Sequence, residues 1–473
     1  MVSMSTPEKS IVLLRELLAL DNSYIDACRL EQVNVICVDN ADQKHKTMPF
    51  KTMYAGNKQF WLKNDTAEYF LSYEDFLKVE ERASGIKAPV ILSIANEADQ
   101  AAKNDHTAQE AGAEQEINGY GQGYDFIAAM TETERASYIK ESKNRLDEFI
   151  AQKQKDRQLV AEAMVESTQD AVLCNHATLM NIMNLSNDDA KKQSKDLILS
   201  TCDFVKSSSQ LILENVYNEE LKGALETKSN GTILQHMTRV YMNGLAFLSY
   251  YNKQVLTSSI INKLRISFKK YAPFYQNLLP HVENLTLEKV FLGGMRAIPE
   301  NDFHDWVVGF LVHDIGKAAA VEYHESDAAF NREIVVEHVY VGYNAILNKT
   351  NYPRGASLIA GWHHEYYGDP SGYGSFRSLL EKHLKTNPDM KPAYCIAYDI
   401  KRMTTCEALA FFPVKMLEIV DVYDALTDPN RRYRKALAPQ EALALMEEEF
   451  VRKNPKLDII LFDLFLKFMQ EAN

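Results

Sequence analysis

The sequence predicts a mainly α-helical protein that carries a small α/β or α+β domain at its N-terminus. The chain has 473 residues, too many for a single compact core, so we expect two or three domains. After residue 123 the apolar residues recur at helical spacing, whereas before residue 95 short helical patterns alternate with β-branched runs. Apolar residues make up 46% of the chain and charged residues 25%, which is the composition of a globular protein.

Residues 1–95 form the predicted N-terminal domain, for which we expect a regulatory or sensory role because it contains no catalytic motif. IVLLRELLAL (11–20) has a helical pattern, and VNVICV (33–38) and APVILSI (88–94) have the pattern of strands. Residues 96–123 are polar and lack a sustained apolar stripe, so we interpret them as a linker.

Residues 124–222 have few glycines and no proline, and their charged residues are interleaved with Leu, Ile, Val and Met. This segment could serve as a helical connector or as a dimerisation element, so a homodimer through it is one expected assembly. Residues 223–473 form the predicted C-terminal domain, in which helices are interrupted by loops such as GDPSGYG.

Charge and cysteine content exclude several classes of function. The formal net charge of -13 argues against binding to a nucleic acid polymer or to anionic lipid. The sequence shows no N-terminal signal pattern and no run of eighteen apolar residues, so it predicts a cytoplasmic protein without a membrane span. The six cysteines contain no CxxC pair, which argues against a disulfide framework or a thiolate zinc site.

Histidines and aspartates in the C-terminal half indicate a metal site. His236 shares a helical face with Ile233 and Val240, and such a residue on its own could equally be a hydrogen-bonded core histidine. His313 and Asp314 end a long apolar run, and Lys317 follows three residues later. A carboxylate delivered by such a run needs a strong partner if it is buried.

Three further segments complete this series. His338 borders an apolar helical stripe, His363 and His364 are adjacent, and Asp421 lies on a stripe with Leu417 and Ala425. Together the five imidazoles and two carboxylates could hold two octahedral cations that share Asp314. The predicted metal ligands are His236, His313, Asp314, His338, His363, His364 and Asp421.

From about residue 230 to 445 the chain resembles the HD-GYP family of HD-domain metal-dependent phosphohydrolases. The matching motifs, in the order of the family, are HDIGK (313–317), EHVYVGYNAIL (337–347), HHE (363–365), DPSGYG (369–374) and DVYDALTDPNRRYRKAL (421–437). The resemblance implies an all-helical HD-type domain and hydrolysis of a cyclic dinucleotide, with cyclic di-GMP first among them, to pGpG or GMP by a metal-bridging hydroxide.

The resemblance also implies roles for individual residues. One metal would be held by His236, His313, Asp314 and Asp421, and the other by Asp314, His338, His363 and His364. Iron or manganese would be the first candidates, and ligand type alone also permits zinc, nickel or magnesium. Lys317 would contact a phosphate oxygen and act with Asp314 in catalysis, and Tyr373, Arg431 and Arg434 would line the substrate pocket.

The chain departs from the family pattern at several positions. Thr232 stands where the family often has a glutamate associated with a third metal, so we expect two metals. Gly374 replaces the proline of GYP, and one extra residue separates His364 from Tyr373. Residues 375–410 form an insertion that could cap the site, narrow it or form an interface.

Three alternatives stay open at this stage. The chain could be a receptor that binds a cyclic dinucleotide without hydrolysing it, and the changed turn favours this reading. It could be an HD phosphohydrolase that acts on another nucleotide. It could also be a structural or partner-binding protein whose histidines belong to the core.

Overall fold

The computed structural model describes residues 11–13, 28, 33–39, 45–50, 67–72, 75, 78–79, 123–152, 156–215, 219–227, 232–319, 332–368, 372–429 and 435–471. The chain divides into two compact units, Met1–His106 and Thr107–Asn473.

The N-terminal unit contains a four-stranded antiparallel sheet in the order β1-β4-β2-β3. The strands are β1 (Ile11–Leu13), β2 (Asn34–Asp39), β3 (His45–Pro49) and β4 (Ala67–Ser72). The strand predicted in VNVICV is confirmed as β2. The helical prediction is wrong for residues 11–13, because they pair with residues 70–72 of β4 and gain a strand's hydrogen bonds there. Residues 88–94 and the predicted linker, apart from Gly123, lie outside the described residues.

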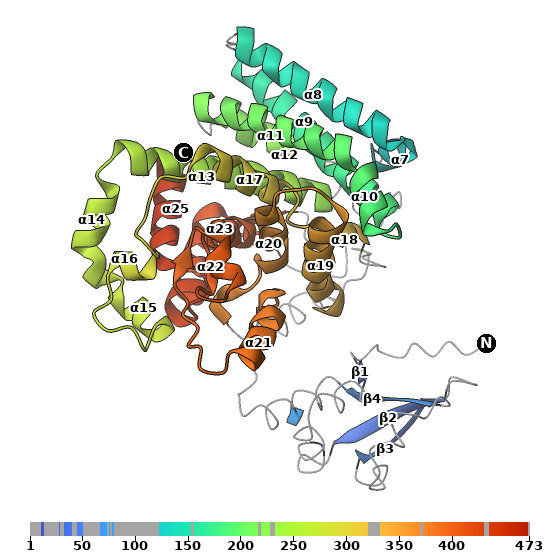
Figure 1. Cartoon of the computed structure of the whole chain (residues 1–473), viewed down its shortest axis with the longest axis vertical. Coiled ribbons are helices and arrows are strands. Elements are labelled where there is room, and N and C mark those ends of the chain that lie inside the picture. The colour runs from blue at the N-terminus through green and yellow to red at the C-terminus, as the bar shows by residue number, and fades with distance from the viewer. Residues whose placement is uncertain are drawn as a thin grey trace. The chain divides into compact units, whose positions relative to one another are not determined.

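In the second unit, most of the described residues of the segment predicted as a connector are helical. The helices are α7 (Gly123–Ala129), α8 (Glu132–Gln152), α9 (Arg157–Ile182), α10 (Asn187–Gln193), α11 (Lys195–Asn215) and α12 (Glu219–Thr227). Asp156 caps α9 by accepting a hydrogen bond from the backbone N–H of Leu159 at 3.1 Å. Every side chain from Ala171 to Leu179 is buried, because α9 packs against α8, against α12 and against α13 (Thr232–Thr257). Figure 1 shows α8, α9 and α11 side by side.

The remaining chain confirms a mainly helical fold. Its α-helices are α13 (Thr232–Thr257), α14 (Ile260–Ser267), α15 (Ala272–Leu278), α16 (Leu287–Val290), α17 (Glu300–Leu311), α18 (Gly316–Ala319), α19 (Arg332–Asn344), α20 (Arg354–Trp362), α21 (Phe376–Thr386), α22 (Ile400–Thr404), α23 (Phe412–Thr427), α24 (Pro439–Leu445) and α25 (Ile459–Glu471). Short 3₁₀ or π segments are η1 (Phe268–Lys270), η2 (Ala345–Lys349), η3 (Tyr366–Gly368) and η4 (Met446–Lys453), and β5 (Ile396–Ala397) pairs in parallel with β6 (Ala410–Phe411).

The packing of five of these helices brings the predicted ligands together. The long helix α13 lies against α17 and α23, α17 packs on α20, and α20 packs on α19 (Figure 1). The backbones of α18 and α19 approach closely at Gly316, where an added Cβ would lie 1.9 Å from the carbonyl oxygen of His338. Glycine at this position therefore allows the α19 histidine to come beside the turn that carries Asp314.

Among the residues that the structure describes, no helix is both long and apolar enough to cross a membrane. The division of the second unit into a connector (124–222) and a separate C-terminal domain (223–473) stays a prediction. In the structure α9 and α11 contact α13, and α11 also contacts α17.

Candidate metal centre

All seven predicted ligands meet in the interior of the helical unit. His236 comes from α13, His313 and Asp314 from the turn after α17, His338 from α19, the pair His363 and His364 from the end of α20, and Asp421 from α23. Each of them is buried, and even His364 exposes only 8% of its surface. Their ligand atoms form two groups: His236, His313 and Asp421 in one, and Asp314, His338, His363 and His364 in the other.

The apolar run before His313 determines where the turn lies. The residues from Trp306 to Val312 are all buried, so the end of α17 is fixed inside the core. The helix ends at Leu311, and the backbone turns so that the N–H of Ile315 bonds to the carbonyl of Val312 at 3.1 Å. Asp314 therefore projects into the interior, where its charge needs a partner.

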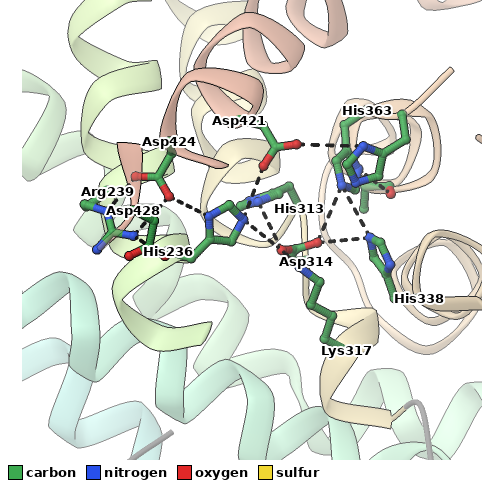
Figure 2. Close-up of polar contacts among 12 residues, drawn as sticks. His236, Arg239, His313, Asp314, Lys317, His338, His363, Asp421, Asp424 and Asp428 are labelled. Atoms are coloured by element: carbon green, nitrogen blue, oxygen red, sulfur yellow. Dashed lines mark hydrogen bonds and ion pairs between the residues drawn. The ribbon is translucent and has the colours of Figure 1, made fainter. Parts of the chain in front are cut away.

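Asp314 lies between the two groups and presents one oxygen to each (Figure 2). Its Oδ2 lies 3.2 Å from Nε2 of His236 and 3.5 Å from Nε2 of His313. Its Oδ1 lies 3.0 Å from Nε2 of His338 and 3.5 Å from Nε2 of His363. This is the position of a carboxylate that could bridge two cations.

Hydrogen bonds to backbone carbonyls orient two of the imidazoles so that Nε2 faces the centre. Nδ1 of His313 donates to the carbonyl of Phe310 at 2.9 Å, and Nδ1 of His363 donates to the carbonyl of Ala360 at 3.0 Å. Because a carbonyl oxygen only accepts, the proton must be on Nδ1, which leaves the Nε2 lone pair available. Nε2 of His313 is buried and has no hydrogen-bond partner among the described residues, as expected for an atom whose partner is a metal.

The second group shows the same convergence of nitrogen atoms. Nε2 of His338 and Nε2 of His363 face each other at 3.4 Å. Nδ1 of His364 lies 3.1 Å from the hydroxyl of Tyr366 and 3.7 Å from Oδ2 of Asp421. Buried imidazoles and carboxylates in this arrangement are suitable ligands for transition metals, so both groups could hold one.

The charges of the site favour an added cation. Burial alone would raise the pKa of Asp314, but the nearby Lys317 ammonium holds it well below its usual range. Burial lowers the pKa of His313 to about 3. Burial would also lower the pKa of His236, but its hydrogen bonds to Asp314, Asp421 and Asp424 outweigh this and raise it to about 10. The carboxylates around His236 therefore favour positive charge at this position, and a cation bound between them would supply it.

Charged residues that were not predicted from the sequence contact His236 on the side away from the centre. Nδ1 of His236 lies 2.7 Å from Oδ2 of Asp424, so it donates there and leaves Nε2 for the centre (Figure 2). Arg239 binds Asp424 through Nε at 2.5 Å and Asp428 through Nη2 at 2.9 Å. A carboxylate behind a ligand histidine fixes the ring and increases its basicity.

Two of the predicted substrate-binding residues lie beside this site. The ammonium of Lys317 forms an ion pair with Oδ2 of Asp314. The ring of Tyr373 lies over that of His364, with centroids 4.4 Å apart and an interplanar angle of 32°. Arg431 and Arg434 lie outside the described residues.

The backbone after His364 is strained, and buried charged side chains contact it. Tyr366 and Tyr367 have φ angles of 44° and 51°, a conformation that side chains other than glycine rarely adopt. Glu418 accepts a hydrogen bond from the backbone of Tyr366. The ammonium of Lys415 lies 4.0 Å from the ring centre of Tyr367 and 2.7 Å from Glu418. These contacts from α23 support the segment whose Tyr366 hydroxyl lies 3.1 Å from Nδ1 of His364.

Comparisons with known proteins give a match among solved structures. No family model matches the chain, and neither does any curated protein. One solved structure, Bd1817, a HDG"Y"P protein from Bdellovibrio bacteriovorus, aligns over 92% of this chain and 94% of its own, with 13% identity and a TM-score of 0.28. A TM-score this low does not establish a shared fold, so membership of the HD-GYP family stays a prediction.

Proposed function

We propose that this chain is a metal-dependent phosphodiesterase of the HD-GYP type that hydrolyses a cyclic dinucleotide, cyclic di-GMP first among them. The proposal is supported by two groups of buried possible ligands, one of which contains Asp314, and by the contact of Oδ2 of Asp314 with His236 of the other group. The motifs of the family occur in its order across residues 313–437. Substrate class and activity are inferred from these two observations together.

The observation that carries the proposal is the division of Asp314 between the two groups. Hydrolysis by a single metal would need only His236, His313, Asp314 and Asp421. Here Oδ1 of Asp314 also faces His338 and His363, at 3.0 Å and 3.5 Å, and both rings are buried. These additional imidazoles favour a site for two metals over the single-metal site of HD hydrolases that act on mononucleotides.

The residues of the chain have separate tasks in this proposal. Two bound cations would polarise a phosphodiester and make water acidic enough to react near neutral pH. Asp424 and the carbonyls of Phe310 and Ala360 orient the imidazoles. An ammonium group has three N–H donors, so Lys317 can hold Asp314 and a phosphate oxygen together. The aromatic ring of Tyr373 offers a surface for a nucleobase or ribose at the edge of the second group.

Hydrolysis of cyclic di-GMP by the metal-loaded protein tests the proposal. Protein purified without oxygen and loaded with iron or manganese is expected to convert cyclic di-GMP to linear pGpG or GMP, and protein stripped by a chelator is not. Tight binding without any linear product would instead identify a receptor. Turnover of another nucleotide in a substrate panel, with none of cyclic di-GMP, would assign the chain to a different HD phosphohydrolase.

A further inference from the structure

The turn that carries Tyr373 is attached to the histidine segment by backbone hydrogen bonds. The N–H of Tyr373 donates to the carbonyl of His364 at 2.9 Å, and the N–H of Ser375 donates to the carbonyl of Gly361 at 2.8 Å. The Tyr373 ring lies over the His364 ring. Side chains that pack against this turn can therefore determine where the Tyr373 ring lies.

Side chains of Glu365 and Arg377 fill the space on both sides of Tyr373. A Cβ at Gly374 would lie 1.9 Å from Oε2 of Glu365, and a Cβ at Gly372 would lie 2.8 Å from Nη2 of Arg377. Contacts below about 3 Å require one of the two groups to move. At Gly372 the added Cβ would also lie 2.8 Å and 2.9 Å from the backbone oxygens of Glu365 and His364. Both residues that flank Tyr373 must therefore be glycine as long as this packing is kept.

Glu365 has little freedom to move away. It exposes only 5% of its surface, and its Oε1 accepts a hydrogen bond from Nε of Arg377 at 2.9 Å. Its Oε2 has no hydrogen-bond partner among the described residues, so this oxygen is placed by packing against Gly374. Loss of Arg377 would remove the cation that donates a hydrogen bond to this buried carboxylate, which is costly.

Arg377 belongs to α21, in the segment that the sequence analysis interpreted as an insertion. The ion pair therefore connects this insertion to the chain that carries His363 and His364. In this chain the Cβ of any residue at position 374, proline included, would meet the Glu365 carboxylate where it now lies.

We infer that Glu365 is a positioning residue that holds the Tyr373 ring against His364, that Arg377 of α21 anchors Glu365, and that Gly374 is required because the Glu365 carboxylate occupies the adjoining space. The role of Tyr373 as a substrate contact rests on the proposed function. The packing between Glu365 and Gly374 does not, so it can be tested separately.

A double-mutant cycle in the full-length chain tests this packing. The variants are Gly374→Ala, Glu365→Ala, Glu365→Gln and the two double mutants that combine Gly374→Ala with each Glu365 change. Gly355→Ala is the matched control, because a Cβ there would make only ordinary contacts, the nearest at 3.6 Å. Each protein is unfolded by denaturant to obtain its unfolding equilibrium constant, and its metal content is measured.

We expect Gly374→Ala to lower the denaturant midpoint and Gly355→Ala to leave it unchanged or higher. In the Glu365→Ala background, adding Gly374→Ala should change the unfolding constant much less than it does in the wild type, because the carboxylate is absent and only Cβ of residue 365, at 3.0 Å, remains near the added Cβ. In the Glu365→Gln background it should be as harmful as in the wild type, because the glutamine side chain fills the same volume. Equal effects of Gly374→Ala in all three backgrounds would overturn the inference.

The positioning role is read from the kinetics with cyclic di-GMP. Glu365→Ala is expected to raise KM about tenfold or more with an unchanged metal content, because a loosened Tyr373 weakens substrate binding. Arg377→Ala should raise KM in the same direction, and Glu365→Gln should stay closer to the wild type. An unchanged KM in Glu365→Ala would refute the positioning role. If the wild-type protein turned over no cyclic di-GMP, the proposed function would fail, while the unfolding cycle would still decide the packing.

Discussion

Replacing Asp424 by asparagine should weaken metal binding without removing any predicted ligand. Asp424 exposes 2% of its surface and contacts Nδ1 of His236 at 2.7 Å and Nε of Arg239 at 2.5 Å. The substitution keeps the size of the side chain but removes the charge that makes His236 a stronger ligand. Loss of such a supporting carboxylate costs about 10–100-fold in metal affinity, and we expect the upper end because no solvent screens this contact.

Competition between the protein and a chelator for Mn²⁺ measures this affinity directly. A hundredfold loss corresponds to about 2.7 kcal/mol of binding free energy. Asp428→Asn is the matched control, because Asp428 also binds Arg239, at 2.9 Å, but is not the residue that accepts from His236. We expect its Mn²⁺ affinity to stay within about threefold of the wild type. Equal affinities for Asp424→Asn and wild type, or equal losses in both variants, would refute a direct role of Asp424 in orienting His236.

Three further predictions concern other parts of the chain. Asp314→Ala should abolish the binding of both metals and all turnover, because the substitution removes the shared ligand. Circular dichroism should still show a helical protein. Retained turnover would exclude the shared site. Lys317→Ala should keep a near-normal metal content, measured by elemental analysis. Its kcat should fall roughly a hundredfold because a phosphate-binding cation is lost. A loss of metal would instead show that Lys317 supports Asp314. Burial raises the pKa of Asp170 on α9 to about 6, so the folded state prefers its neutral form and loses stability as the pH rises from 4 to 6. Asp170→Asn should therefore unfold at a higher temperature than wild type at pH 7, by an amount equivalent to at most roughly 3 kcal/mol, and at the same temperature at pH 4; an equal difference at both pH values would contradict this assignment.

The sequence could predict the candidate ligands because local pattern was enough to find them. Asp314 follows an apolar run and Asp421 lies on an apolar helical stripe, so each had to be a buried carboxylate with a strong partner. The charged residues that surround His236 could not be predicted from the sequence alone. Asp424 lies three residues after Asp421 and Arg239 three residues after His236, but only the packing of α13 on α23 shows that these side chains meet.

The tertiary structure also changed two local interpretations. Residues 11–13 have a helical pattern but form β1, because pairing with β4 outweighs a weak local preference. In the sequence, Gly374 is a departure from the proline of GYP, and the changed turn favoured a receptor without hydrolysis. In the structure Gly374 lies against the Glu365 carboxylate, a residue nine positions earlier, and no spacing rule connects the two.

Electron paramagnetic resonance of the Mn²⁺-loaded protein tests most directly whether Asp314 bridges two metals. With Mn²⁺ added to saturation and counted by elemental analysis, we expect two ions per chain and the spectrum of an exchange-coupled pair, because one carboxylate would connect them. A single ion per chain with the spectrum of an isolated Mn²⁺ would contradict the shared site, and with it the proposed phosphodiesterase mechanism.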